Sequence, residues 1–172
     1  MGAVNPGKRF EGKLKASMEA AGVFSMRIPD KLYISGGRVR SKETPADFVA
    51  YVSTEYALEC MLIEAMACSR NRIPFDALKP HQDEALTRFD GMHGNAHGVV
   101  AVNFYDSVSL ARMDVCFMVP IEVWREYRDG DMKSLSHDDC TGDKRISLCP
   151  KDGALYDMSG WIRGFADGGT VS

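Results

Sequence analysis

The sequence contains no long apolar run. No stretch approaches the roughly 18 unbroken apolar residues of a membrane span, and the first residues, MGAVNPGKRFEGK, lack the apolar segment of a secretion signal. The five cysteines are odd in number and none are spaced as C-x-x-C, which argues against a disulfide framework. These absences speak against a membrane protein or a disulfide-stapled secreted domain, and predict a cytoplasmic protein with reduced thiols.

A convincing metal cluster of histidines is also missing. His93 and His97 are four residues apart, but Gly94 and Gly98 beside them favour a loop over a rigid helix. We therefore expect no zinc site at these residues.

What is present is an ordinary globular composition with an uneven charge. The 172 residues are 45% hydrophobic and 26% charged, which suits one compact domain with a short tail. Residues 1–82 contain 12 Lys and Arg against 9 Asp and Glu, whereas residues 83–172 contain 9 against 15. The net charge of −3 therefore does not exclude a polyanionic partner at the N-terminal half, although a solvated mixed surface has the same composition.

Apolar spacing and turn residues predict an α/β domain with a mixed sheet flanked by helices. Helices are expected at residues 7–22, 80–92 and 121–130, and strands at 23–28, 31–35, 47–53, 57–65, 98–105 and 112–120. Residues 35–46 read as a loop or the tip of a flexible hairpin, because Gly36, Gly37 and Pro45 interrupt any regular pattern. We place the domain at residues 1–130 and an acidic, loop-rich extension that packs on it at residues 131–172.

Two carboxylates are candidate metal ligands. Asp47 opens one expected strand and Glu64 lies near the end of the next. If these strands are neighbours, both acids can meet at one edge of the sheet and bind Mg²⁺, which prefers oxygen ligands. Taken by spacing alone, two acids on successive strands more often face solvent than bind a metal.

Four short motifs together are a more specific signal than the acid pair. The stretches NPGKRFE (5–11), TPAD (44–47), LIEA (62–65) and IPFDALKPHQ (73–82) occur in that order. Together they resemble RecU-type Holliday junction resolvases, also called penicillin-binding protein-related factor A, of the PD-(D/E)xK nuclease superfamily. The resemblance runs from about residue 5 to about residue 127. The matching positions are Asn5, Gly7, Glu11, Thr44, Asp47, Glu64, Ala65, Pro74, His81 and Gln82.

The resemblance implies a fold, an activity and a set of roles. The fold would be a restriction-endonuclease-like mixed sheet, and the activity Mg²⁺- or Mn²⁺-dependent cleavage of four-way DNA junctions in recombination and repair. Asp47, Glu64 and the Ala65 carbonyl would bind the metal, while Glu11 and Gln82 would complete the catalytic site. Thr44 would orient the metal ligands or a phosphate, although capping or a core hydrogen bond explains it as well.

One departure bears on catalysis directly. Met66 stands where the family has a lysine that helps to activate water and offsets charge on the phosphate. A thioether does neither, and the loss of such a contact can cost about 10²–10³ in rate. Three explanations stay open: a deliberate inactivating change, a naturally degenerate nuclease, or another cation in its place. Arg70 and Arg72 are near in sequence, but they follow the strand and are poor proton-transfer groups.

A second departure affects substrate choice. In the family the region corresponding to residues 29–44 is a longer stalk that enters the junction, and here it is shorter but still basic. The predicted DNA contacts are Lys8, Arg9, Arg38, Arg40, Lys42, Arg70 and Arg72.

Three functional hypotheses remain. The first is a homodimeric junction-resolving endonuclease, expected from a phage or prophage, in which Met66 impairs the chemistry. The second is a branched-DNA-binding relative without cleavage. The third is a protein-interaction module whose acidic tail binds a recombinase partner.

Overall fold

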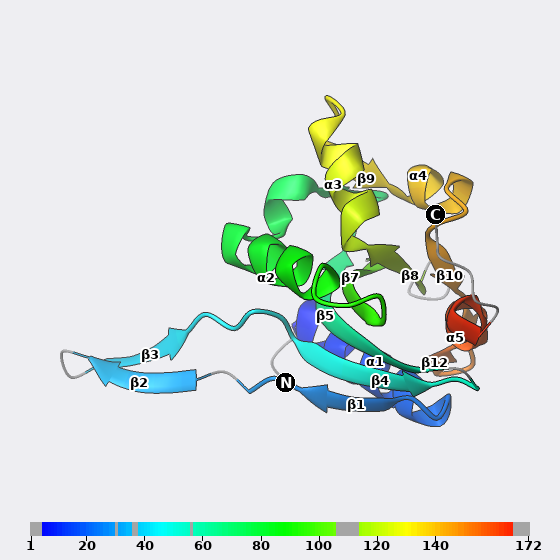
Figure 1. Cartoon of the computed structure of the whole chain (residues 1–172). Coiled ribbons are helices and arrows are strands. Elements are labelled where there is room, and N and C mark those ends of the chain that lie inside the picture. Colours follow the sequence, from blue (N-terminus) through cyan, green and yellow to red (C-terminus); the bar gives the residue numbers. More distant parts are fainter. Residues whose placement is uncertain (1–4, 30, 36–37, 56, 106–113, 167–172) are drawn as a thin grey trace.

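The protein is built on one six-stranded mixed sheet, seen in a computed structural model of the whole chain (Figure 1). The structure describes residues 5–29, 31–35, 38–55, 57–105 and 114–166, with the backbone alone at 31–35, 38–42 and 166. The strands of the sheet, in spatial order, are β1 (Phe24–Arg27), β4 (Phe48–Ser53), β5 (Leu58–Cys68), β7 (Ala96–Tyr105), β8 (Asp114–Pro120) and β10 (Ser147–Cys149). Strands β5 and β7 pair in parallel and the other neighbours pair antiparallel. The predicted α/β class with a mixed sheet is confirmed.

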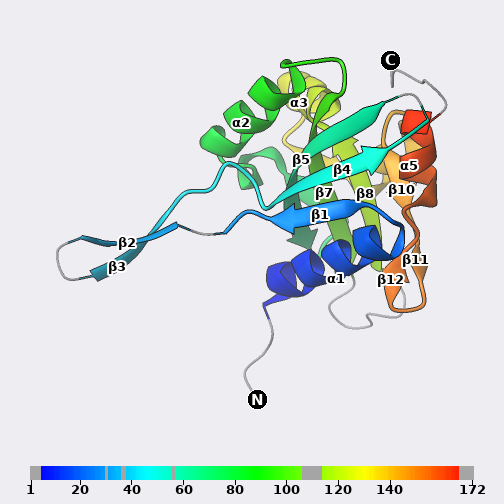
Figure 2. The ribbon, with the colours of Figure 1, turned by 60° about the horizontal axis from the view of Figure 1, so that its bottom comes forward.

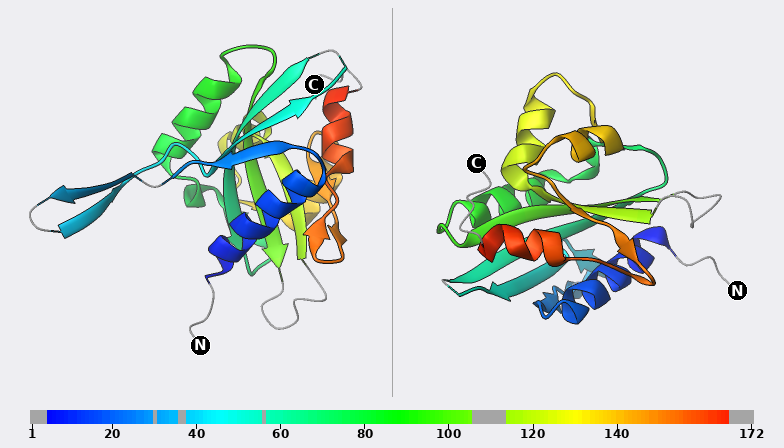
Figure 3. Two further views of the ribbon diagram at one scale, coloured as in Figure 1. Left: turned by 90° about the horizontal axis from the view of Figure 1, so that it is seen from below. Right: turned by 90° about the vertical axis from the view of Figure 1, so that its right-hand side faces the viewer.

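Helices cover both faces of the sheet, so the molecule has three layers (Figures 2 and 3). Helices α1 (Pro6–Ala20) and α5 (Ser159–Ala166) lie on one face, and α2 (Pro80–Asp90), α3 (Ile121–Asp129) and α4 (His137–Gly142) lie on the other. Each face has its own buried apolar cluster, one around Trp124 and the other around Leu14 and Met18. Burial of this apolar surface is the main force that holds the helices to the sheet.

Alternation along β5 assigns its side chains to the two clusters. Leu62 and Met66 belong to the cluster beneath α2 and α3, whereas Met61 and Ile63 belong to the cluster beneath α1. Because successive side chains of a strand point to opposite faces, Glu64 lies on the same face as Met66. Buried polar side chains interrupt the apolar centre of the sheet at Glu59 and Glu64 on β5 and at Asn103 on β7.

The helix ends follow from local chemistry. The Asn5 side chain accepts a hydrogen bond from the Gly7 N–H at 2.9 Å, and Pro6 occupies the first turn of α1. Helix α2 packs tightly on β7 at Gly98, where a Cβ atom would come within 2.4 Å of the Leu86 carbonyl oxygen. Glycine is required at that crossing because no other residue permits so close an approach.

Several short elements were not predicted. Residues 38–42 form β3 (Arg38–Lys42), which pairs with β2 (Lys31–Ser35) in an antiparallel ribbon that extends away from the sheet (Figures 1 and 2). The predicted break at Gly36 and Gly37 lies outside the described residues, as do residues 112 and 113 at the start of the strand expected there. Strand β6 (Arg72–Pro74), followed by the 3-10 turn η1 (Phe75–Ala77), pairs with β9 (Ser134–Ser136). That pairing joins distant segments, so a local pattern does not reveal it.

Residues 131–166 contain more regular structure than the expected loop-rich extension. Strand β10 is an edge strand of the main sheet, and β11 (Lys151–Asp152) pairs with β12 (Leu155–Tyr156). Leu135 and Trp161 belong to the two buried clusters. This segment is part of both cores, and the domain boundary at residue 130 stays a prediction.

Candidate functional site

The candidate site lies where β4 begins beside the second half of β5. Asp47 immediately precedes β4, and its N–H donates to the Ile63 carbonyl at 3.0 Å. Its carboxylate oxygen Oδ2 accepts a hydrogen bond from the Ala65 N–H, also at 3.0 Å. These two bonds hold the Asp47 carboxylate against β5. The N–H and C=O of one strand residue point toward the same neighbour, so the Ala65 carbonyl faces this edge as well.

Glu64 is the buried member of the carboxylate pair. Its residue is 8% exposed, and its side chain receives a hydrogen bond from Gln82 at the start of α2. Gln82 in turn accepts the Lys79 N–H through Oε1 at 3.0 Å, which leaves its amide NH₂ to face Glu64. Glu64 Oε2 is buried and has no hydrogen-bond partner in the part of the chain that the structure describes. A buried carboxylate oxygen without a partner is costly and calls for a ligand that the protein alone does not supply.

The two carboxyl groups influence each other's ionisation. Burial, followed by the negative charge of Asp47, raises the pKa of Glu64 to about 8, against a lowering by the Gln82 hydrogen bond. Burial also raises the pKa of Asp47, and the Ala65 hydrogen bond opposes this. With its pKa raised to about 8, Glu64 is mainly protonated near neutral pH when no cation is bound.

A third carboxylate approaches from helix α1, as the resemblance implies. Glu11 accepts hydrogen bonds from the Arg27 guanidinium at 2.9 and 3.1 Å, and the Lys8 ammonium lies 3.5 Å away. Its charge is close enough to add to the raised pKa values of both Asp47 and Glu64. The structure thus brings together four of the predicted site residues: Glu11, Asp47, Glu64 and Gln82.

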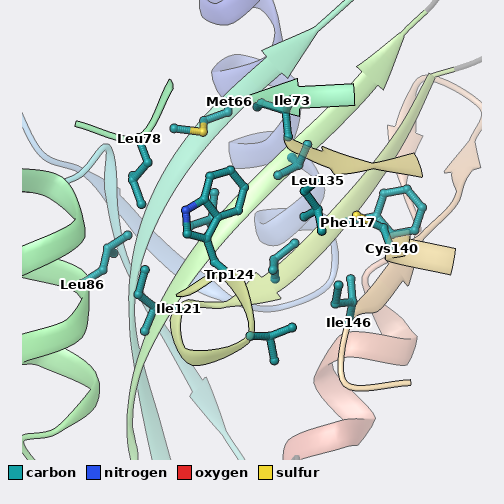
Figure 4. Close-up of a cluster of buried hydrophobic side chains, with 14 of the residues drawn as sticks. Met66, Ile73, Leu78, Leu86, Phe117, Ile121, Trp124, Leu135, Cys140 and Ile146 are labelled. Atoms are coloured by element: carbon teal, nitrogen blue, oxygen red, sulfur yellow. The ribbon is translucent and has the colours of Figure 1, made fainter. Parts of the chain in front are cut away.

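Met66 has a different environment from its predicted neighbours in the site. It is 8% exposed and belongs to the apolar cluster that includes Ile73, Leu78 and Trp124 (Figure 4). Its thioether packs there between β5 and the segment leading to α2. The side chain has no group that could carry charge, so its role in the folded chain is packing.

The other motif residues lie around the site without forming part of the acid cluster. Thr44 is half-buried, and Pro74 is the exposed last residue of β6. The His81 ring lies 3.3 Å from the Glu43 carboxylate. These positions neither add a ligand to the carboxylate pair nor exclude one.

The predicted DNA-contacting cations occupy three places. Lys8 and Arg9 lie on α1, where the Arg9 guanidinium stands 5.6 Å from the centre of the Tyr105 ring. Arg70 and Arg72 are exposed after the end of β5. Arg38, Arg40 and Lys42 lie on strand β3, and their side chains are outside the described structure.

Two cations near the acids were not predicted. Arg27 ends β1 and neutralises Glu11, while Lys79 precedes α2 and its positive charge favours ionisation of Glu64. Neither position carries a local signal beyond its charge, because the strand and helix that bear them meet the site only through the fold.

The carboxylate pair fits a hard divalent ion in its donor set. Two carboxylates and a backbone carbonyl are oxygen donors, and Mg²⁺ typically takes one or two carboxylates and completes its shell with water and phosphate oxygens. The unpartnered Glu64 Oε2 would gain its missing partner. Within the described ranges no group of three or more His, Cys, Asp or Glu side chains is placed to hold a metal ion.

Comparisons with known proteins find similar solved structures. No protein-family model and no curated protein matches the chain. The chain is similar to the solved structure of Hjc from Archaeoglobus fulgidus, a Holliday junction resolvase from an archaeal hyperthermophile. The two share 22% sequence identity with a TM-score of 0.44, over 67% of this chain and 78% of that one. In the described residues no helix has the length and apolar content needed to cross a membrane.

Proposed function

We propose that the protein is a divalent-metal-dependent endonuclease that cuts branched DNA, with four-way junctions as its preferred substrate. The observation that carries the proposal is the buried Glu64 carboxylate, whose Oε2 lacks a partner while Asp47 stands beside it. An acidic pair of this kind is expensive to bury without a cation. A hard cation such as Mg²⁺ or Mn²⁺ would relieve both the repulsion and the missing hydrogen bond.

The reaction would be hydrolysis of a phosphodiester. One water adds to phosphorus, one phosphorus–oxygen ester bond breaks, and the departing sugar oxygen takes up a proton. A bound divalent ion supplies acidification of the water and polarisation of the phosphate. Asp47 and Glu64 would hold that ion with the Ala65 carbonyl, and the Ala65 N–H would fix the orientation of Asp47.

The basic ribbon offers a route for DNA into the site. Strand β3 carries Arg38, Arg40 and Lys42, and the chain then runs directly to Asp47. Five residues span at most about 17 Å, so a phosphate backbone bound along the ribbon can continue to the carboxylates. We infer that the ribbon binds the branched substrate and that a second copy of the chain provides the second cut of a symmetric junction.

Neutralising the ribbon should weaken DNA binding without altering the acids. The triple change Arg38→Gln/Arg40→Gln/Lys42→Gln should lower junction affinity and reduce the slope of log affinity against log salt by about 0.9 for each lost phosphate contact. The matched control is Lys133→Gln/Lys144→Gln/Arg163→Gln, which removes three exposed cations elsewhere. Equal salt slopes for the two triple variants would assign the ribbon to plain solvated surface.

The proposed activity is tested by a nicking assay on junction, flap and linear duplex DNA. We expect Mg²⁺-dependent cuts, fastest in the junction, that disappear in the Asp47→Asn variant. Cutting that continues without a divalent ion, or in Asp47→Asn, would contradict the proposal.

The position of Met66 favours a second candidate function, a branched-DNA-binding protein that no longer cleaves. Its side chain sits in an apolar cluster and offers no charge to the site. Tight junction binding by the wild-type chain with no cleavage in Mg²⁺ or Mn²⁺ would support this alternative over the nuclease.

A further inference from the structure

The candidate site has a surplus of negative charge on the side that faces α2. Glu11 is neutralised by Arg27 and Lys8 from the α1 side of the sheet. Glu64 lies on the opposite face, where Met66 supplies no charge. A reaction that builds negative charge on a phosphate needs a cation on this side.

Lys79 stands at that side and is tied to Glu64 through the backbone. Its N–H donates to Gln82 Oε1 at 3.0 Å, and the Gln82 side chain donates in turn to Glu64. The preceding residue, Leu78, is buried beside Met66 in the apolar cluster (Figure 4), whereas Lys79 itself is exposed. The segment before α2 thus turns its apolar residue into the core and leaves its charged residue at the site.

The Lys79 ammonium is also available for a ligand. Lys8, Lys13, Lys15 and Lys151 have carboxylate partners, as Lys13 does with Asp114 at 2.8 Å. Across the residues that the structure describes, the ammonium of Lys79 takes part in no ion pair or side-chain hydrogen bond.

The arginines closest in sequence to Met66 do not fill this role. Arg70 and Arg72 are exposed beyond the end of β5, and neither is among the charges that act most strongly on Asp47 or Glu64. The Arg72 carbonyl accepts a hydrogen bond from the Cys68 thiol at 3.0 Å, which holds this backbone along the outer end of the strand.

We propose that Lys79 is the cation of the site, contacting the phosphate at the Asp47–Glu64 pair from the start of α2 in place of a lysine at position 66. This inference rests on the proposed nuclease function. It makes Lys79 a catalytic residue that the motif pattern does not contain, and it explains how Met66 can belong to the core of a working enzyme.

The test uses Lys79→Gln, with Lys144→Gln as the matched control because Lys144 is exposed on the segment between α4 and β10. Junction cleavage in Mg²⁺ should fall by about 10²-fold or more in Lys79→Gln and stay unchanged in the control. Junction affinity in Ca²⁺, measured across a salt series, should show a slope smaller by about 0.9, the value for one lost phosphate contact. Thermal melting should confirm that both variants are folded.

A rescue experiment separates a transferred charge from a merely structural role. The double change Met66→Lys/Lys79→Gln should recover at least tenfold of the lost cleavage, because a lysine at position 66 lies on the same face as Glu64. Cleavage by Lys79→Gln at the wild-type rate would overturn the inference, as would an unchanged salt slope. If the wild-type chain binds junctions but cuts none, the nuclease proposal fails, and the salt slope of Lys79→Gln alone decides whether Lys79 contacts phosphate.

Discussion

Strand β5 carries two glutamates that are equally buried and differently satisfied. Glu59 and Glu64 are each 8% exposed. Glu59 lies 2.8 Å from the His97 ring nitrogen, and that ring packs against Phe165 at 5.0 Å. Glu64 lies five residues further along the strand, where its Oε2 has no partner in the described structure and stands beside a second carboxylate. Burial alone therefore does not distinguish the two, whereas hydrogen bonding does.

The difference separates a structural acid from a candidate functional one. A buried acid paired with histidine completes the packing between β5, β7 and the C-terminal helix. A buried acid with an orphaned oxygen and an acidic neighbour lowers stability unless a cation binds, and such costs are typically retained where they serve a site. We interpret the part of β5 around Glu64 as the functional part of the strand.

The largest expected effect is on cleavage. Glu64→Gln keeps the shape of the side chain and removes the negative charge, so we expect junction cleavage to fall by about 10³-fold or more. Glu59→Gln makes the same chemical change five residues away and should leave the rate within about twofold of wild type. Similar losses in both variants, measured in one nicking assay, would erase the distinction between the two glutamates.

The next effect is on the pH dependence of stability. The pKa of Glu64 is raised to about 8 from an ordinary value of 4.5, chiefly by burial, so the folded chain holds this proton more tightly than the unfolded chain. The stability that this provides is complete below about pH 4.5 and is lost as pH rises through 8. Since one pKa unit is worth about 1.4 kcal/mol, unfolding free energy without metal should fall by on the order of a few kcal/mol from pH 5 to 9.

Urea denaturation at several pH values measures this fall. Glu64→Gln should flatten the profile and Glu59→Gln should keep it. The depressed pKa values of Asp114 and Asp143, held down by hydrogen bonds and cationic neighbours, act in the acidic range and do not overlap this window. A flat profile for the wild-type chain would contradict the assignment of a buried, protonated Glu64.

The smallest effect is expected at Glu59, whose carboxylate has a hydrogen-bond partner. His97→Ala leaves Glu59 buried without its partner and should cost about 1–3 kcal/mol of unfolding free energy. Because His97 lies on β7 and contacts Glu59 rather than the carboxylate pair, saturating Mg²⁺ should raise the melting temperature of His97→Ala and of wild type by similar amounts. If His97→Ala abolished the stabilisation by Mg²⁺, the metal would have to bind near Glu59.

Local sequence patterns are enough to predict most of the sheet and helices, but they identify only part of the candidate site. The apolar spacing of residues 10–18 and the Asn5–Pro6 start are enough to predict α1, and the continuous apolar run at 99–102 predicts an internal strand. The β6–β9 pairing and the place of β10 at the sheet edge depend on distant segments and have no local signature. The functional residues differ in the same way: some have a local sequence signal and others do not.

The candidate site contains residues of both kinds. Asp47 and Glu64 were identified by a motif resemblance, and the fold places them beside each other, while their role as metal ligands stays a prediction. Lys79 could not be identified in that way, because its approach to Glu64 depends on how α2 docks on the sheet through Gln82. Equally, nothing in the sequence told Glu59 from Glu64 by environment, since the partner of Glu59 comes from β7, 38 residues away.

Calorimetric titration of Mg²⁺ or Mn²⁺ into the metal-free protein at about pH 8 tests the central claim most directly. We predict saturable binding in the wild-type chain, retention of that binding in Glu59→Gln, and its loss in Glu64→Gln. Unchanged binding in Glu64→Gln, or no binding in the wild-type chain, would contradict the assignment of the Asp47–Glu64 pair as a metal site.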